Sequence, residues 1–311
     1  MLRVGRSLVS ALTRSGVQVA VLDSTKVAND AVGRHNILSK LHATALVDTL
    51  NSAILLNMNM KGEERVELSI FSQDPASPVQ AVRAESIFTG EVRGYVNPTH
   101  SDTVGQYDGP NHGLGADPIL HVSKVLYSQE QKQQSYIQIP DESIEQGLET
   151  YFEKSDQIDS FVRLSATATA VANGEQTCPH FDRSGGLFAQ RLPGVPDVDW
   201  AGVVGSLREQ STLYKDIVHV ASDPASEFYG DLIGSLCAHV PSIDIDETTV
   251  RRKPIDFFCR CTREKFLSQI LGMTLETRKD LLQDSDPVIT RCHNCNTSYS
   301  FGESDILGEA A

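Results

Sequence analysis

The spacing of apolar residues predicts helices interspersed with strands over the first 195 residues. Apolar side chains recur at helical spacing over 36–58, which predicts a helix with one buried face. A second amphipathic helix is expected after an Asp141 cap. Strand patterns occur at 17–22, 66–70, 87–96, 119–126, 136–139 and 161–164, and a last strand opens at 185–188. This order favours an α+β fold, with a large N-terminal antiparallel or mixed sheet domain over 1–195.

The pattern changes after the turn-like sequence Leu192–Pro196. Ten acidic residues stand against two basic ones between Pro196 and Thr249, and apolar residues recur at helical spacing over 203–220 and 226–240. These stretches could place an amphipathic face against the larger domain. A segment of this composition has little core of its own and depends on its neighbours for order. We expect a helical, acidic linker over 196–250, which either moves or serves as an ordinary static connector.

Four of the six cysteines lie in two tight pairs near the end of the chain. Cys259 and Cys261 form a C-x-C pair, Cys292 and Cys295 form a C-x-x-C pair, and 30 residues separate the pairs. Four converging thiolates are the ligands of a structural Zn²⁺ site, whereas four ordinary buried cysteines or a disulfide framework would not need this clustering. We predict one Zn²⁺ per chain. His293 is not expected to bind it, because four sulfurs fill a tetrahedron.

The residues around the cysteines predict a small α+β domain over 251–311. Thr262 is placed to cap a helix directly after the first cysteine pair. Alternation around Tyr299 and Phe301 predicts a short strand that packs aromatic rings beside the second pair. The two remaining thiols, Cys178 and Cys237, are isolated, and Cys237 is expected to pack in an apolar helix face.

Composition restricts partners and location. The 311 residues have a hydrophobic content of 40%, a formal net charge of −14 and a pI near 5.0. Strong acidity argues against a nucleic-acid partner, and no run approaches 18 apolar residues, so no membrane span is predicted. We expect a cytoplasmic protein. An arginine- and serine-rich start without an acidic residue before Asp23 resembles a mitochondrial transit peptide, which makes mitochondria the alternative.

The sequence carries no recognisable catalytic motif. It contains no G-x-x-x-x-G-K-[ST], no G-x-S-x-G and no H-E-x-x-H. The glycine-rich segment 105–115 lacks a phosphate-binding register and is expected to be a loop. A zinc hydrolase would also need an open coordination position, which a four-sulfur site does not offer. We therefore expect a protein that is not an enzyme.

The chain resembles the heat-shock protein 33 family over nearly its full length. The most specific match is the pattern F-x-C-x-C-[ST]-R-E at Phe257–Glu264, combined with the C-x-x-C pair and the aromatic residues after it. Two further stretches are similar to the family, at 41–61 and 148–157. One departure is Asn296, which stands where the family often has glycine after the last cysteine.

This resemblance implies a redox-regulated, ATP-independent holdase chaperone that binds unfolded or partly unfolded client proteins under oxidative stress. In the family's oxidised form, zinc is released, and Cys259 would pair with Cys261 and Cys292 with Cys295. The resemblance also allows for a homodimer of the oxidised chain. From the residues alone, a static zinc-ribbon module that docks a protein or nucleic-acid partner is the alternative.

Overall fold

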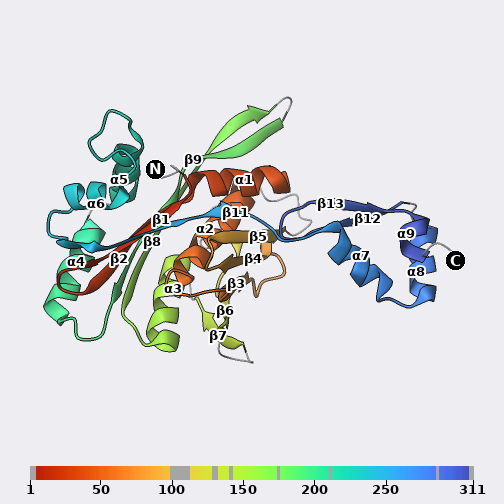
Figure 1. Ribbon diagram of the computed structural model, residues 1–311, viewed down its shortest axis with the longest axis horizontal. Helices are drawn as coiled ribbons and strands as arrows, with labels where there is room; N and C mark the ends of the chain where they lie inside the picture. The colour runs from red at the N-terminus through yellow and green to blue at the C-terminus, as the bar shows by residue number, and fades with distance from the viewer. Residues whose placement is uncertain are drawn as a thin grey trace. The chain divides into compact units, whose positions relative to one another are not determined.

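The computed structural model describes residues 5–98, 113–127, 132–139, 143–173, 176–209, 212–284 and 287–307. The chain forms two compact units, Met1–Phe257 and Phe258–Ala311. The first contains two large sheets with helices and the second a small two-stranded sheet with helices, which confirms the predicted α+β class (Figure 1). Most of the glycine-rich segment 105–115 lies outside the described residues. In the described part of the chain, no helix has the length and apolarity needed to cross a membrane.

The first sheet of the large unit is five-stranded and antiparallel. Its spatial order is β10 (Ile245–Pro254), β1 (Ser7–Thr13), β2 (Val17–Asp23), β9 (Gln176–Arg191) and β8 (Ser160–Asn173). Strand β2 confirms the pattern at 17–22. The predicted strands at 161–164 and 185–188 are too short, because the small and polar residues between them alternate only weakly and yet continue the β8–β9 ladder.

The second sheet of the large unit has six strands. Its order is β11 (Asp256–Phe257), β5 (Glu91–Pro98), β4 (Val79–Ile87), β3 (Arg65–Phe71), β6 (Ile119–Val125) and β7 (Gln133–Gln138). Only the β11–β5 pairing is parallel. The single strand predicted over 87–96 is wrong. Gly90 has a φ of 96° and its amide donates to the Ile87 carbonyl at 2.9 Å, so a tight turn separates β4 from β5.

Helix α2 (Lys40–Leu56) contacts strands of both sheets. The sequence correctly predicts a helix here, but the single buried face is wrong, because fourteen of its seventeen residues are buried. Polar residues on the helix reach partners inside the unit: the Asn51 amide donates to the Ser184 hydroxyl at 3.1 Å and accepts from Ser24 at 2.5 Å. These hydrogen bonds let polar side chains lie in the interior.

The remaining helices of the first half are α1 (Thr25–His35) and α3 (Ile144–Tyr151), which continues as the π-helix η3 (Phe152–Asp156). Asp141 lies outside the described residues, and the observed N-cap of α3 is Ser143. The Ser143 hydroxyl accepts from the Gln146 amide, and the Gln146 side chain accepts from the Ser143 amide, which completes a capping box.

The acidic segment after residue 196 forms three helices, α4 (Asp197–Glu209), α5 (Leu213–Ser222) and α6 (Leu232–His239). Their apolar residues share one buried cluster with side chains of the five-stranded sheet. The chain then continues as β10 and β11, which pair with β1 and β5. In the first unit, therefore, this segment covers one face of a sheet and then adds a strand to each sheet.

The second unit consists of α7 (Arg263–Leu271), α8 (Leu275–Asp284), the antiparallel pair β12 (Val288–Arg291) and β13 (Ser298–Phe301), and α9 (Glu303–Leu307). The Thr262 hydroxyl accepts from the Lys265 amide at 3.3 Å, as predicted for the α7 cap. The fully buried apolar side chains of its core are Ile270, Val288, Phe301 and Ile306.

Candidate functional site

Two short turns bring the four cysteines of the second unit together. Cys259 and Cys261 precede α7, whereas Cys292 and Cys295 lie between β12 and β13. In the second turn the amide of Asn296 donates to the Cys292 carbonyl at 2.7 Å. Asn296 has a φ of 58°, in the left-handed region, where asparagine is tolerated better than most residues after glycine. The departure from the family's glycine therefore leaves the turn intact.

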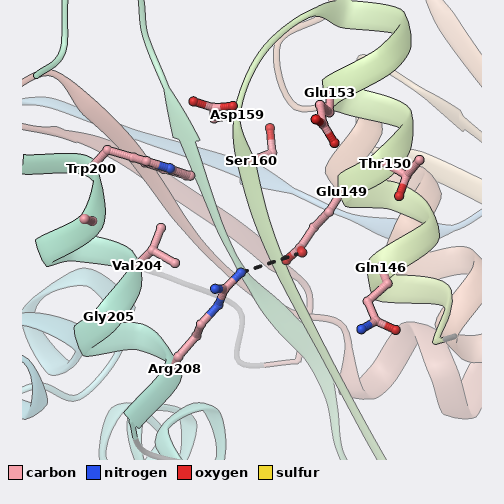
Figure 2. Close-up of a pocket in the computed structure, with 11 residues that line it drawn as sticks. Gln146, Glu149, Thr150, Glu153, Asp159, Ser160, Trp200, Val204, Gly205 and Arg208 are labelled. Atoms are coloured by element: carbon pink, nitrogen blue, oxygen red, sulfur yellow. Dashed lines mark ion pairs between the residues drawn. The ribbon is translucent and has the colours of Figure 1, made fainter. Parts of the chain in front are cut away.

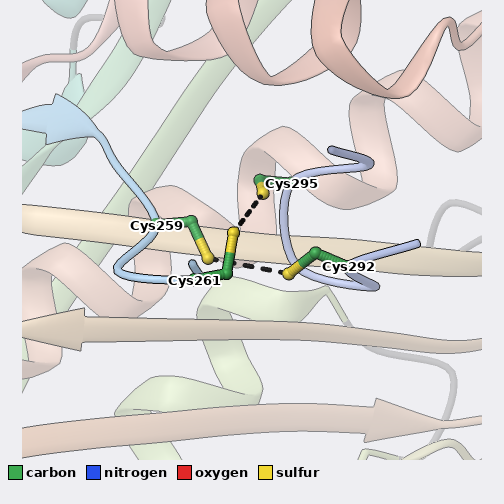
Figure 3. Close-up of side chains that lie close together, drawn as sticks. All are labelled: Cys259, Cys261, Cys292 and Cys295. Atoms are coloured by element: carbon green, nitrogen blue, oxygen red, sulfur yellow. Dashed lines mark hydrogen bonds between the residues drawn. The ribbon is translucent and has the colours of Figure 1, made fainter. Parts of the chain in front are cut away.

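The four sulfur atoms converge on one point (Figure 3). All of them lie within 4.8 Å of one another, with 3.7 Å between the sulfurs of Cys259 and Cys292 and 3.4 Å between those of Cys261 and Cys295. Sulfurs about 2.3 Å from a tetrahedral zinc ion would be about 3.8 Å apart. The residues therefore fit a closed four-thiolate metal site. The converging ligand atoms include no nitrogen of His293.

Hydrogen bonding distinguishes the four thiols. Burial opposes ionisation of Cys295, but hydrogen bonds with the hydroxyl and amide of Thr297 bring the pKa of Cys295 down to about 7. Burial and the nearby Cys259 raise the pKa of Cys292, and burial also raises the pKa of Cys261. Neighbouring thiols cannot all ionise at neutral pH without a compensating cation. A divalent metal ion would supply that charge.

Tyr299 contributes a contact that the sequence pattern did not predict. Its ring was expected beside the second cysteine pair, but its hydroxyl lies 3.2 Å from the Cys261 sulfur and donates to the Cys261 carbonyl at 3.1 Å. This contact with Cys261 raises the pKa of Tyr299. Because the residues are 38 positions apart, only the paired β12–β13 strands bring them together.

The two other cysteines lie in the first unit, on β9 and α6. Cys237 packs, partly buried, against the apolar cluster of α4–α6, which confirms its predicted packing role. Burial raises the pKa of Cys237, so its thiol is not activated as a nucleophile.

Polar contacts also join the acidic segment to the rest of the first unit. A cavity of about 560 Å³ lies between α3 and α4, and Arg208 of α4 points across it to Glu149 of α3, with 3.8 Å between charged atoms (Figure 2). Arg163 of β8 donates to the Leu207 carbonyl at 3.0 Å. Burial raises the pKa of Glu149 even though its carboxylate accepts from the Val162 amide. Few charged contacts hold α4, so apolar packing carries most of its attachment.

Comparison with known proteins agrees with this arrangement. The Hsp33 protein family model matches residues 7–302. A 33 kDa chaperonin of Bacillus licheniformis is 24% identical over 307 residues, covering 96% of each chain. One from Listeria monocytogenes is 25% identical over 305 residues, also covering 96% of each chain. One from Deinococcus radiodurans is 26% identical over 294 residues, covering 92% of this chain and 91% of its own.

A crystal structure of the 33 kDa chaperonin (heat shock protein 33 homolog) from Thermotoga maritima has a similar fold, with a TM-score of 0.77 and 21% identity, and the match covers 97% of this chain and 96% of that one. The family match spans both sheets, the three helices of the acidic segment and all four clustered cysteines. This chain therefore belongs to the Hsp33 family of chaperones.

Proposed function

We propose that this protein is a redox-regulated, ATP-independent holdase that binds unfolding proteins after its four-cysteine centre is oxidised. The observation that carries the proposal is the convergence of four sulfurs within 4.8 Å in a unit with a small apolar core. A second observation supports it: the acidic segment that precedes this unit covers a large apolar face of the five-stranded sheet.

Cys259, Cys261, Cys292 and Cys295 would hold one Zn²⁺ per chain. When bound, the ion joins the two cysteine turns, which are separated by α7, α8 and β12, and its contribution to folding is about 10–16 kcal/mol in comparable zinc modules. The four-sulfur set leaves no open coordination position, so a structural role is favoured over hydrolysis.

Oxidation would replace this link by two short disulfides. A thiolate attacks a peroxide oxygen, breaks the O–O bond and becomes a sulfenic acid as water leaves after protonation; a second thiol then displaces water and forms the disulfide. Each disulfide thus converts one hydrogen peroxide into two waters. All sulfur pairs lie within 4.8 Å, so the pairing of Cys259 with Cys261 and Cys292 with Cys295 rests on the family resemblance.

These disulfides could not restore the lost stability. Closing a ring of three or four residues reduces the entropy of the unfolded chain by only about 1.5–2 kcal/mol, whereas the metal contributes about 10–16 kcal/mol. With this pairing, neither bridge would join the two cysteine turns. The oxidised second unit would therefore unfold.

The acidic segment offers the surface that a client could use. Its helices and the sheet share a cluster in which the side chains from β1, β2, β8 and β9 include Val9, Val19, Val21, Phe161 and Leu187, and those from the helices include Leu207, Leu213, Ile217, Leu232 and Leu236. If α4–α6 detach, the sheet residues become exposed apolar surface, which is the kind of surface that binds unfolded chains. The net negative charge of the segment would favour its detachment and keep complexes soluble.

We place the protein in the cytoplasm. The arginine-rich start that resembles a transit peptide includes β1, which pairs with both β2 and β10. Removal of residues 1–22 would delete β1 and nearly all of β2 from the middle of the five-stranded sheet. A transit peptide of that length would therefore destroy the fold, which disfavours the mitochondrial alternative.

The test follows zinc and activity together. The reduced protein is treated with hydrogen peroxide or hypochlorite while a colorimetric chelator reports zinc release and far-ultraviolet circular dichroism reports folding. Light scattering then measures aggregation of a chemically unfolded client. We expect zinc release, loss of helix signal and suppressed aggregation, with the same result for Cys237→Ser. Unchanged aggregation would refute the holdase, and unchanged zinc content and circular dichroism would favour a static zinc module.

A further inference from the structure

A second cavity in the first unit has no role in the proposed switch. It has a volume of about 800 Å³ and lies between strands β1 and β10, the end of α2 and the turn between β4 and β5. Cavities of about 300–1,000 Å³ are typical of small-molecule sites. Alternation along β1 separates its two faces: Leu8 and Leu12 line the cavity, whereas Val9 belongs to the cluster under α4–α6.

One part of the cavity wall is apolar. Leu8, Met58 and Met60 are buried, and Phe88 is partly buried beside them. Methionine side chains are flexible and polarisable, so they adapt to aliphatic or aromatic groups of varied shape. This wall is suited to the apolar body of a ligand.

The rim of the cavity is basic. Lys61, Arg251, Arg252 and Lys253 line it, and no Asp or Glu is among the described residues that do so. Arg252 has a carboxylate partner outside the cavity, since its guanidinium lies 3.5 Å from Asp231. In a chain with a net charge of −14, a cavity lined by four cationic residues and no acidic one is a local reversal of the electrostatic potential.

Lys253 is held in place at the junction of the apolar wall and this rim. Its ammonium donates to the Asn57 carbonyl at 3.3 Å and to the Asn57 side-chain oxygen at 3.4 Å, and lies 4.4 Å from the centre of the Phe88 ring. It forms no ion pair within the part of the chain that the structure describes. Burial lowers the pKa of Lys253 to about 8, as expected for a cation that lacks a carboxylate partner.

We propose that this cavity binds an anionic amphiphile, specifically an aliphatic carboxylate whose headgroup contacts Lys253 and Arg251 and whose chain packs on Met58, Met60 and Phe88. The carboxylate would supply the charge that Lys253 lacks. The aliphatic chain would remove apolar wall from water. This site is independent of the proposed redox switch.

Ligand binding would have a structural consequence. The cavity is formed by β1 on one side and β10 on the other, so a bound molecule contacts both strands. A ligand that binds only the paired strands stabilises their pairing in proportion to its saturation. Amide exchange along β10 should therefore slow when the ligand is present.

The experiment uses the full-length, reduced, zinc-loaded protein and dodecanoate below its micelle concentration, with binding measured by isothermal titration calorimetry. We expect one site per chain, at least about tenfold weaker binding of the neutral dodecanol, and at least about tenfold weaker binding of dodecanoate to Lys253→Met, because a charge-assisted hydrogen bond is lost. Lys26→Met, which removes an exposed lysine of α1 outside the cavity, should bind like the parent protein.

Several outcomes would overturn this proposal. Equal affinity for dodecanol would show a merely apolar cavity, and equal affinity for inorganic phosphate would show an anion site without an apolar component. Binding of many dodecanoate molecules without saturation would indicate detergent-like association. If Lys253→Met does not fold, the exposed Arg251→Gln replaces it, and exchange protection of β10 by dodecanoate must then be weaker than in the parent protein.

Discussion

Removal of the metal from the reduced protein should unfold the second unit and leave the first unit folded. The second unit has 54 residues and only four fully buried apolar side chains, at Ile270, Val288, Phe301 and Ile306. A core of this size in a chain of fewer than about 70 residues rarely supplies more than about 3–5 kcal/mol of net stability. A structural zinc site contributes about 10–16 kcal/mol. Its loss therefore exceeds what the remaining core can offset.

Hydrogen exchange of backbone amides can localise this effect. After chelation under reducing conditions, the amides of α7 and β13 should lose protection, whereas those of α2 should retain it, because α2 is buried between two sheets. The single tryptophan, Trp200, lies on α4 against the apolar cluster, so its fluorescence reports separately whether α4 detaches. Cys237→Ser serves as the matched thiol control. Retained protection of α7 and β13 in the metal-free protein would refute the reasoning.

Three further predictions concern the first unit. Ile217→Ala removes a fully buried side chain between α5 and the sheet and should cost about 2–5 kcal/mol; urea unfolding followed by Trp200 fluorescence should show a lower midpoint, and an unchanged midpoint would contradict the proposed apolar attachment. Gly185→Ala should destabilise the protein by at least about 3 kcal/mol, since its φ is 153° and a Cβ would lie 1.9 Å from the Leu22 carbonyl oxygen. In the same thermal melt, Gly33→Ala, which meets no atom within 4 Å on α1, should be neutral or stabilising, and similar melting temperatures for the two variants would disprove the steric argument. Lys253 has a pKa of about 8 in the folded protein, below its unfolded value of about 10.4, so the unfolded state binds more protons between these values and the parent protein gains stability as pH rises from 8 towards 10. Lys253→Met lacks this term, so urea unfolding at pH 7.5, 8.5 and 9.5 should show the parent gaining relative to the variant, and a constant difference would exclude the buried-lysine explanation.

Local patterns were sufficient for much of the second unit. The spacing of Cys259, Cys261, Cys292 and Cys295 predicted the convergence of their sulfurs, and Thr262 caps α7 as expected. Short turns place these residues through contacts close in sequence, so the residue types themselves carry the information. Strands β2, β3 and β6 were predicted for a related reason, because alternation of buried and exposed residues is a local property.

Long-range packing determined what the patterns missed. Helix α2 was expected to be buried on one face, but two sheets enclose it and Asn51 finds its partner at Ser184, 133 residues away. The contact of Tyr299 with Cys261 likewise depends on strand pairing. No local rule identifies such partners.

The sequence by itself determined the fold class, the family and the four candidate metal ligands, because these depend on periodicity and on residue spacing within short segments. Only the tertiary structure decided that the acidic helices cover one face of the β10-β1-β2-β9-β8 sheet and that Lys253 meets Met58 and Phe88 in one cavity. The physical reason is that these contacts join segments up to 245 residues apart, as in the pairing of Leu8 with Lys253. Such pairings depend on burial shared by the whole unit rather than on the preference of any one segment.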